Sequence, residues 1–407
     1  MQETEVTVVG GGPAGMIAAG TAARRGKKVI LLEKNDILGK KLGITGKGRC
    51  NITNDIDVEG LIDNIPVNNS FLYSAFYTFS NSQLINFLNE LGLETKVERG
   101  QRVFPVTDKA RDVVKTLQKF LKENKVQIIK EKAEDIQSVN KGFIVKTSSG
   151  MNISSENVVI ATGGVSYPAT GSTGDGYDFA KKLGHSITSL YPSLVPLEVR
   201  EDWIKEAQGL SLKNVEITVF ADDREIFEDF GEMLFTHYGV TGPIILSASS
   251  HMRDMANRDY KLVIDLKPAL SFEKLDKRIQ RDFKKYSRKY FGNSLGDLLP
   301  RKLIPVIIEL SEIPYSKKVN QITKKERYDL VQLLKNMTLY VEDYRPLKEA
   351  IVTSGGVDVD EIDPGTMESK IVKDLYFAGE IIDVDGYTGG FNLQIAFSTG
   401  FLAGNNC

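Results

Sequence analysis

EVTVVGGGPAGMIAAGTAARRGKKVILLEK, residues 5–34, is the stretch that decides the fold of this chain. It contains an apolar strand pattern, a glycine-rich turn, a helix pattern rich in small residues and a second apolar strand pattern. Parallel strands need a crossover connection, usually a helix, so this order predicts a βαβ unit of about 30 residues. The predicted fold class is therefore α/β.

The turn carries the spacing G-x-G-x-x-G at Gly10, Gly12 and Gly15. In dinucleotide-binding proteins the first glycine permits a tight turn, the second lets a pyrophosphate approach, and the third allows close helix–strand packing. The helix that follows, beginning at Pro13 and Ala14, would offer free N–H groups and a partial positive charge to phosphates. Alone, such a triplet could be ordinary turn chemistry.

Glu33 makes the dinucleotide interpretation much stronger than the ordinary turn. It ends the second strand pattern, where a carboxylate accepts hydrogen bonds from a ribose 2′-OH and repels a 2′-phosphate. The first nucleotide bound is therefore not expected to be NADP. The next residue, Lys34, is included among the expected cofactor contacts.

The composition sets broad limits on the function. The chain has 407 residues, enough for two or three domains, and its formal net charge of −2 gives no global sign of a nucleic-acid or membrane partner. Two cysteines cannot form a disulfide scaffold, so a reducing cytoplasm is expected. No apolar run approaches the length of a membrane span, and the N-terminus does not read as a secretory signal.

The secondary structure expected from the sequence changes along the chain and then returns to the α/β type of the first residues. Helix patterns at 81–93 and 109–124 precede short strands over 126–161, which we expect to form a β-meander between two parallel strands. Beyond about residue 190 the chain reads as strands and hairpins, and 271–340 is mostly helical and locally basic. Glycine-rich α/β character returns after 350, which indicates one domain interrupted by an inserted module.

Two further segments narrow the dinucleotide to FAD. NVVIATGG (157–164) and LYFAGEIIDVDG (375–386) resemble a strand–turn and a late strand of two-dinucleotide-binding-domain flavoproteins of the glutathione-reductase type. The resemblance implies that Ala161, Thr162, Gly163 and Gly379 lie beside FAD. Glu380 stands where that pattern has an Asp for the ribityl chain, so this contact either stays with the longer side chain or passes to Asp383 or Asp385.

Five segments resemble the bacterial and archaeal family of BaiN-like or aminoacetone-oxidase-like NAD(P)/FAD-dependent oxidoreductases, over essentially the whole chain. They are LEKNDILGKKLGITGKGRCNITN, GQRVFPVTDKARDVV, LFTHYGVTGP, TSGGVDVDEIDPGTMESK and LYFAGEIIDVDGYTGGFNLQIAFSTGFLAG. The resemblance implies a Rossmann-like FAD domain split by a β-rich insertion with a helical subdomain. The expected boundaries are 1–190 and 350–407 for the FAD domain, 191–265 and 325–349 for the β-rich domain, and 266–324 for the helical subdomain.

The same resemblance implies that 39–54 wraps the flavin side of FAD and that TGGFNLQ (388–394) approaches the ring. A helix after these glycines would aim N–H groups at the part of the ring that is negative when reduced. A helix start with glycines for packing alone is the alternative. The implied contacts are Lys41, Gly46, Arg49, Cys50, Asn51, Thr53, Gly389, Gly390, Phe391, Asn392 and Leu393.

The remaining reactive residues carry weaker signals. Cys50 has no second cysteine nearby in the sequence, so a packed thiol is favoured over a redox disulfide. His237 lies in a family-like motif and is the candidate proton donor or substrate ligand, with a structural histidine as the alternative. Three scattered histidines and two cysteines give no metal-ligand cluster. TGKGR does not satisfy the phosphate-loop pattern of nucleoside triphosphatases.

We therefore expect an FAD-dependent oxidoreductase acting on a small molecule by hydride transfer at flavin N5. No second nicotinamide-binding domain is evident, so NAD(P)H would bind transiently at the flavin. The favoured reaction is NAD(P)H-dependent reduction of an activated C=C bond. Oxidation of a small amine with release of hydrogen peroxide is the alternative. A tRNA-directed flavoprotein that uses the basic helix at 272–290 is a remote one: acids are spread among the cations of this helix, so a solvated helix face is favoured and no nucleic-acid partner is expected.

Overall fold

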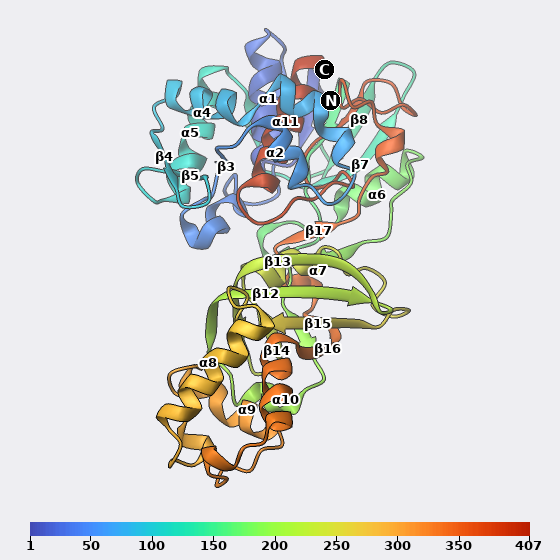
Figure 1. Ribbon diagram of the computed structural model, residues 1–407. Helices are drawn as coiled ribbons and strands as arrows, with labels where there is room; N and C mark the ends of the chain where they lie inside the picture. The colour runs from blue at the N-terminus through green and yellow to red at the C-terminus, as the bar shows by residue number, and fades with distance from the viewer. The chain divides into compact units, whose positions relative to one another are not determined.

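The computed structural model describes residues 1–407, which fold as two compact units (Figure 1). Unit 1 comprises Met1–Ser193 and Pro346–Cys407, and unit 2 comprises Leu194–Arg345. These limits lie within four residues of the expected interruption at 190 and 350. Each unit has its own hydrophobic core.

Unit 1 is built on a seven-stranded sheet in the order β6-β2-β1-β9-β8-β7, with β18 also paired to β9. The parallel members are β1 (Gln2–Val9), β2 (Val29–Leu32), β6 (Gln127–Ile129), β9 (Asn152–Ile160) and β18 (Leu375–Phe377). The antiparallel members are β7 (Ala133–Ser138) and β8 (Phe143–Thr147), which form the expected meander with β9. The central strands end in continuous buried runs, as strands covered on both faces do.

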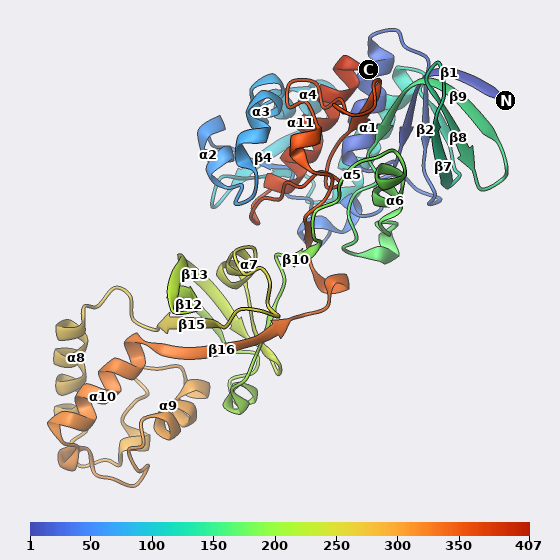
Figure 2. The same ribbon diagram turned by 90° about the vertical axis from the view of Figure 1, so that its right-hand side faces the viewer.

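The small residues of α1 (Pro13–Arg24) and α11 (Phe391–Asn406) let these two helices lie side by side (Figure 2). A Cβ atom on Gly400 would lie 2.4 Å from the carbonyl oxygen of Ala14, and one on Gly404 would lie 2.3 Å from that of Ala18. Only glycine fits at these two positions. The first and last helices of the chain thus pack backbone to backbone in one core.

The other elements of unit 1 surround this core. The expected helix at 109–124 is α5 (Ala110–Glu123), and the one at 81–93 is α4 (Asn81–Glu90), which begins with a capping box at Ser80. The remaining helices are α2 (Val58–Asp63), α3 (Tyr73–Thr78) and α6 (Asp175–Lys182). Two small sheets pair β3 (Thr53–Asn54), β5 (Arg102–Pro105) and β4 (Thr95–Glu98), and β10 (Tyr191–Ser193) with β17 (Val352–Ser354).

Unit 2 contains a closed six-stranded barrel. Its strands, in barrel order, are β11 (Leu197–Val199), β14 (Gly239–Thr241), β13 (Arg224–Phe235), β12 (Ser211–Ala221), β15 (Tyr260–Asp265) and β16 (Met337–Tyr344). The long β12–β13 hairpin turns at Asp222 and Asp223, both with positive φ, as two-residue hairpin loops require. A short helix, α7 (Pro243–Ser249), packs on β13.

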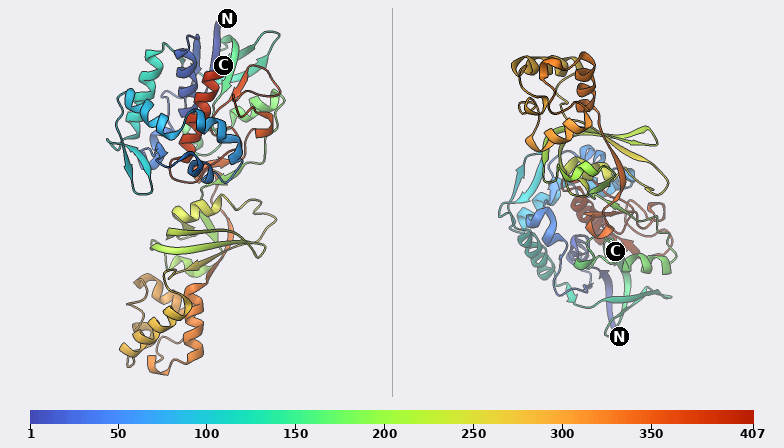
Figure 3. Two further views of the ribbon diagram at one scale, coloured as in Figure 1. Left: turned by 45° about the horizontal axis from the view of Figure 1, so that its top comes forward. Right: turned by 90° about the horizontal axis from the view of Figure 1, so that it is seen from below.

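Three helices, α8 (Phe272–Lys285), α9 (Ile304–Leu310) and α10 (Lys324–Lys335), form a group beside the barrel strands (Figure 3). Their apolar side chains belong to the same core cluster as the barrel. The expected boundary between 324 and 325 falls at the start of α10, because the capping box at Thr323 begins a helix there and β16 starts only at Met337. None of the helices combines the length and apolar character needed to cross a membrane.

Candidate cofactor and active site

A cavity of about 200 Å³ opens in unit 1 at the carboxyl ends of the parallel strands. Four strands, β1, β2, β9 and β18, are each followed directly by a residue that lines it: Gly10, Glu33, Ala161 and Ala378. Ligands of open α/β sheets bind at this edge, where the connections leave the strands. The cavity therefore lies where the sequence predicted a dinucleotide.

The three motif glycines have different surroundings. Gly10 has φ of +110°, and a Cβ atom on it would lie 2.4 Å from the carbonyl oxygen of Ala161. On Gly15 a Cβ atom would lie 1.9 Å from the carbonyl oxygen of Gly10. At Gly12, by contrast, nothing lies within 4 Å of the Cβ position. The turn is closed where it packs on the protein and open at Gly12, as the predicted approach of a pyrophosphate requires.

The first turn of α1 places partial positive charge beside this opening. Gly12 is the N-cap of the helix and supplies no side-chain cap, so the first N–H groups have no partner from a capping side chain. Uncapped N–H groups together with the positive end of a helix dipole bind phosphate. Pro13 and Ala14 line the cavity beside them.

Glu33 is held at the end of β2 by three hydrogen bonds. Its Oε2 accepts from the Gly11 N–H at 2.8 Å, and its Oε1 accepts from the backbone N–H and the side-chain Nδ2 of Asn35, both at 2.7 Å. The side chain is buried, yet it lines the cavity. A carboxylate has further lone pairs, so it can also accept from the hydroxyl groups of a ribose.

Lys34 turns toward the loop that follows β9. Its Nζ donates to Asp175 at 2.6 Å and to Thr173 at 2.5 Å. Thr162, which lines the cavity, has a buried hydroxyl without a hydrogen-bond partner in the protein. A buried polar atom without a partner is costly, and a bound ligand would relieve that cost.

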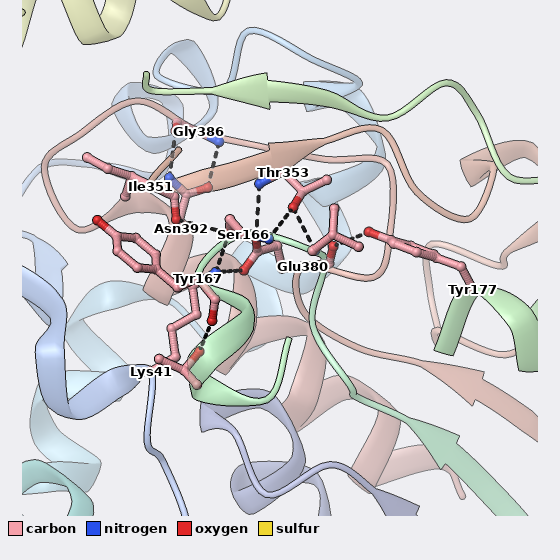
Figure 4. Close-up of polar contacts among 11 residues, drawn as sticks. Lys41, Ser166, Tyr167, Tyr177, Ile351, Thr353, Glu380, Gly386 and Asn392 are labelled. Atoms are coloured by element: carbon pink, nitrogen blue, oxygen red, sulfur yellow. Dashed lines mark hydrogen bonds and ion pairs between the residues drawn. The ribbon is translucent and has the colours of Figure 1, made fainter. Parts of the chain in front are cut away.

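Glu380 forms the centre of a polar network at the other end of the cavity (Figure 4). Its Oε2 accepts from the Nζ of Lys41 at 2.6 Å, and its Oε1 accepts from the Ser166 hydroxyl at 2.9 Å and the Thr353 N–H at 3.0 Å. Lys41 also donates to the Ser166 hydroxyl at 2.6 Å. The longer side chain at position 380 thus reaches protein partners on three other segments.

The pair of Lys41 and Glu380 remains accessible from the cavity. Both residues line it, and each side chain is 21% exposed. An ion pair of this kind presents a donor and an acceptor to a ligand without leaving an isolated buried charge. Of the two aspartates that the sequence offered as substitutes for Glu380, neither lines the cavity.

The N-terminus of α11 closes the same end. Gly390, its N-cap, has φ of +103°, and a Cβ atom there would lie 2.5 Å from the carbonyl group of Thr53. Asn392 ties down the preceding loop by accepting from the Gly386 N–H at 2.9 Å and donating to the Gly386 carbonyl oxygen at 2.6 Å. Asn392 and Leu393 line the cavity, whereas Phe391 is buried beside it. The helix starts without a capping side chain, as expected for one that faces an electron-rich group.

Segment 39–54 enters the site only in part. Gly39 to Leu42 and Thr45 line the cavity. The expected contacts outside the lining are Gly46, Arg49, Cys50, Asn51 and Thr53.

Arg49 has other partners. Its guanidinium contacts Glu98 and Asp108, each at 2.5 Å, and stacks over Phe104. The hydrogen bonds that Arg49 donates to the carboxylates of Glu98 and Asp108 raise its pKa. The implied contact between Arg49 and FAD stays a prediction that these ion pairs do not favour.

Cys50 is fully buried, and both cysteines of the chain are free thiols. Burial raises the pKa of the Cys50 thiol to about 12. A thiol with so high a pKa is a poor nucleophile, because the thiolate is the reactive form. The packed-thiol interpretation fits this environment.

His237 belongs to unit 2, where its exposed ring packs edge-on against Tyr238. It does not line the cavity. Its role as a proton donor or substrate ligand stays a prediction. No group of three or more His, Cys, Asp or Glu side chains is arranged to hold a metal ion.

The structure also adds residues to the site. Asn35, Ser166, Thr353 and the turn at 170–173 hold or line it, and none was singled out from the sequence. The glycine cluster at 163–176 was a signal for the last of these. No sequence pattern indicated Ser166 or Thr353, since single hydroxyl side chains are common in loops.

The family match and the named relatives define the class of protein: an oxidoreductase on a Rossmann-type fold. A family model described as the HI0933-like protein Rossmann domain matches residues 4–406. The chain belongs to this HI0933-like family, and the resemblance to BaiN-like flavoproteins is confirmed.

Similar proteins span the whole chain. The 3-dehydro-bile acid delta(4,6)-reductase of Clostridium scindens is 32% identical over 405 residues, 98% of either chain. The ribosomal RNA dihydrouridine synthase of Escherichia coli is 28% identical over 400 residues, 98% of this chain and 96% of that one. The structure of 3-ketosteroid delta1-dehydrogenase from Sterolibacterium denitrificans matches with a TM-score of 0.53 at 13% identity, covering 100% of this chain and 99% of that one, which shows the shared fold.

Proposed function

We propose that this protein uses FAD to reduce a C=C bond conjugated to a carbonyl group, with NAD(P)H as the hydride source. One observation carries the choice of reaction. The two relatives described above are named for reductions of a C=C bond, in a 3-oxo compound and in uridine, and in both substrates this bond is conjugated to a carbonyl group. Neither is named as an oxidase, so the amine-oxidase alternative lacks this support.

The residues that line the cavity fit FAD. We assign the open turn at Gly12 and the N-terminus of α1 to the pyrophosphate, and Glu33 to the adenosine ribose. Lys41 and Glu380 fit the ribityl and ring end, together with the N-terminus of α11. When bound, FAD supplies a ring that accepts a hydride from one molecule and passes it to another.

The protein's part in the reaction is to bind, orient and polarise. The uncapped N–H groups of α11 provide partial positive charge fixed in place before reaction, which favours negative charge at the ring. The hydrogen bonds of Asn392 to Gly386 keep the loop before this helix in one position. The Lys41–Glu380 pair offers a proton donor and an acceptor at the same end of the cavity.

The substrate class has two candidates. A small enone is the first, because the more similar of the two relatives is named for a bile-acid derivative. A uridine in RNA is the second, because the other relative is named for ribosomal RNA. Both place the same bond type before the flavin, so they predict the same half-reaction with NAD(P)H and differ only in the oxidative half.

Anaerobic stopped-flow spectroscopy tests the reaction. We expect NADH or NADPH to bleach the flavin absorbance, and a 4-en-3-oxo steroid or a uridine-containing RNA to restore it. A panel of small amines, with hydrogen peroxide measured in air, is the control. Bleaching by an amine with peroxide release, and none by either nicotinamide, would contradict the proposal.

A further inference from the structure

We infer that unit 2 carries an RNA-binding surface formed by Arg288, Lys289, Tyr290, Tyr315 and Lys318, hereafter the basic–tyrosine cluster. The inference deepens the proposed function and rests on it in one respect: it selects a base in RNA as the substrate that is reduced. The surface itself is argued from charge, contacts and exposure within unit 2.

The helical part of unit 2 is strongly basic, which the net charge of the chain conceals. Residues 266–336 contain 17 Lys and Arg against 8 Asp and Glu, a formal charge of +9 in a chain whose total is −2. The rest of the chain therefore carries −11. A basic region in an acidic protein is the electrostatic footprint of a polyanion partner.

Two segments of this region lie side by side. The residues that follow α8 and those that precede α10 are joined by an antiparallel bridge between Tyr290 and Lys318. The N–H of Val319 donates to the carbonyl oxygen of Lys289 at 3.1 Å, and that of Phe291 to Lys317 at 2.8 Å. The cluster is therefore a feature of the fold and not only of the sequence.

The cations of the cluster are not neutralised by acidic side chains, although the Lys289 ammonium lies over the Tyr286 ring. Arg288, Lys289 and Lys318 are exposed and form no ion pair. Their neighbours differ, since Lys285 is paired with Asp297 at 2.7 Å and Lys317 with Glu326 at 2.6 Å. Acidic partners thus neutralise the flanks of the cluster and leave its centre positive.

The tyrosines indicate unpaired bases. Tyr290 is 47% exposed and Tyr315 is 52% exposed. Tyr315 is also held in position, because its hydroxyl donates to Asn293 at 2.8 Å and its ring covers Gly292, where a Cβ atom would lie 2.0 Å away. Aromatic rings held beside cations provide the stacking surfaces that single-stranded segments use.

The same surface does not fit a membrane. The large exposed hydrophobic side chains of residues 266–336 are Tyr290, Tyr315 and Tyr328, with no exposed Leu, Ile, Phe or Trp. A helix that binds a bilayer needs such residues on its apolar face to insert into the lipid. The cluster therefore favours RNA over anionic lipid.

Fluorescence anisotropy of the full-length holoprotein with a labelled RNA hairpin of about 20 nucleotides, carrying a uridine-rich loop, tests this surface. We expect binding that weakens from about 50 to about 200 mM KCl. The triple variant Arg288→Gln, Lys289→Gln, Lys318→Gln should bind about tenfold more weakly, with a log–log salt slope that is less negative by about 2. The matched control Lys115→Gln, Lys122→Gln, Lys125→Gln removes three exposed charges from unit 1 and should bind as the wild type does.

A second pair of variants tests stacking. Tyr290→Ala with Tyr315→Ala should weaken binding about tenfold or more, whereas Tyr290→Phe with Tyr315→Phe should retain it. Undetectable RNA binding at low salt, equal losses in the two triple variants, or tighter binding to vesicles of phosphatidylglycerol than to RNA would each overturn the inference. Flavin bleaching by NAD(P)H is measured in parallel, so failure of the surface and failure of the proposed reaction are told apart.

Discussion

At the scale of single residues, Glu33 and Cys50 show how position decides what a reactive group does. Glu33 is a buried carboxylate that accepts two hydrogen bonds from Asn35 and one from the Gly11 N–H in the glycine-rich turn, and it still lines the cavity. Cys50 lies in the segment expected to wrap the flavin, yet it is packed in the core without a disulfide partner. The carboxylate is arranged for binding and the thiol for packing.

Replacing Glu33 tests the ribose contact. Glu33→Gln keeps the size of the side chain but turns one acceptor into a donor facing the N–H of Gly11 or Asn35. Hydrogen bonds to a charged group contribute about 1.5–3 kcal/mol, so we expect FAD to bind at least about tenfold more weakly. Flavin release measured by fluorescence is the readout, and unchanged affinity would remove Glu33 from the site.

The buried thiol of Cys50 should make the free energy of unfolding depend on pH in alkaline solution. Its pKa is raised from 9.0 to about 12 in the folded state, so the folded protein keeps a proton that the unfolded chain loses. The stability from this proton is complete below pH 9 and is lost as the pH rises toward 12. Over that interval we expect the free energy of unfolding of the wild type to fall by about 1.4 kcal/mol per pH unit more than that of Cys50→Ser.

Urea unfolding of both proteins between about pH 8 and about pH 10.5 measures this difference in the free energy of unfolding. Cys50→Ser should also retain FAD and most of its activity, since the thiol has no redox partner. Loss of flavin reduction with FAD still bound would show that the thiol takes part in the chemistry.

At the scale of elements, the strand–turn–helix at 5–24 contains one glycine that folding requires and another that leaves room for a ligand. A Cβ atom at Gly15 meets a backbone oxygen at 1.9 Å, whereas one at Gly12 meets open space. The turn therefore needs Gly15 in order to form, whereas Gly12 leaves room for a ligand.

Two alanine variants follow from that difference. Gly15→Ala should lower the melting temperature of the protein strongly, because the overlap with backbone cannot be relieved by a side-chain shift. Gly12→Ala should melt near the wild-type apoprotein but purify without flavin. Calorimetry of the apoproteins and the ratio of flavin to protein absorbance check both, and a stable, flavin-loaded Gly15→Ala would contradict the assignment.

At the scale of the whole molecule, two separate cores predict two unfolding steps. The core of unit 1 and that of unit 2 share no residues, and the cavity is lined by unit 1 alone. A ligand stabilises the unit that binds it. Added FAD should therefore raise one calorimetric transition and leave the other in place, and a single transition that moves as a whole would show that the units unfold together.

Much of unit 1 could be predicted from the sequence. The βαβ unit, the roles of Gly10, Gly12 and Gly15, and the place of Glu33 all depend on contacts within about one crossover. The hairpins and helices of unit 2 followed from local periodicity in the same way. The expected boundary at 324/325 falls at the start of α10 and not at its end, because a helix that leads directly into a strand carries no glycine or proline signal where it ends.

The sequence by itself determined the dinucleotide turn, the carboxylate beside it and the interruption of one domain by another, because short-range sterics and glycine conformations fix them. Only the tertiary structure decided the other end of the cavity. There Lys41, Ser166 and Glu380 meet across 125 to 339 positions of the chain, and Arg49 forms ion pairs with Glu98 and Asp108. Which of these distant residues come into contact depends on how the elements pack, and no local sequence pattern predicts it.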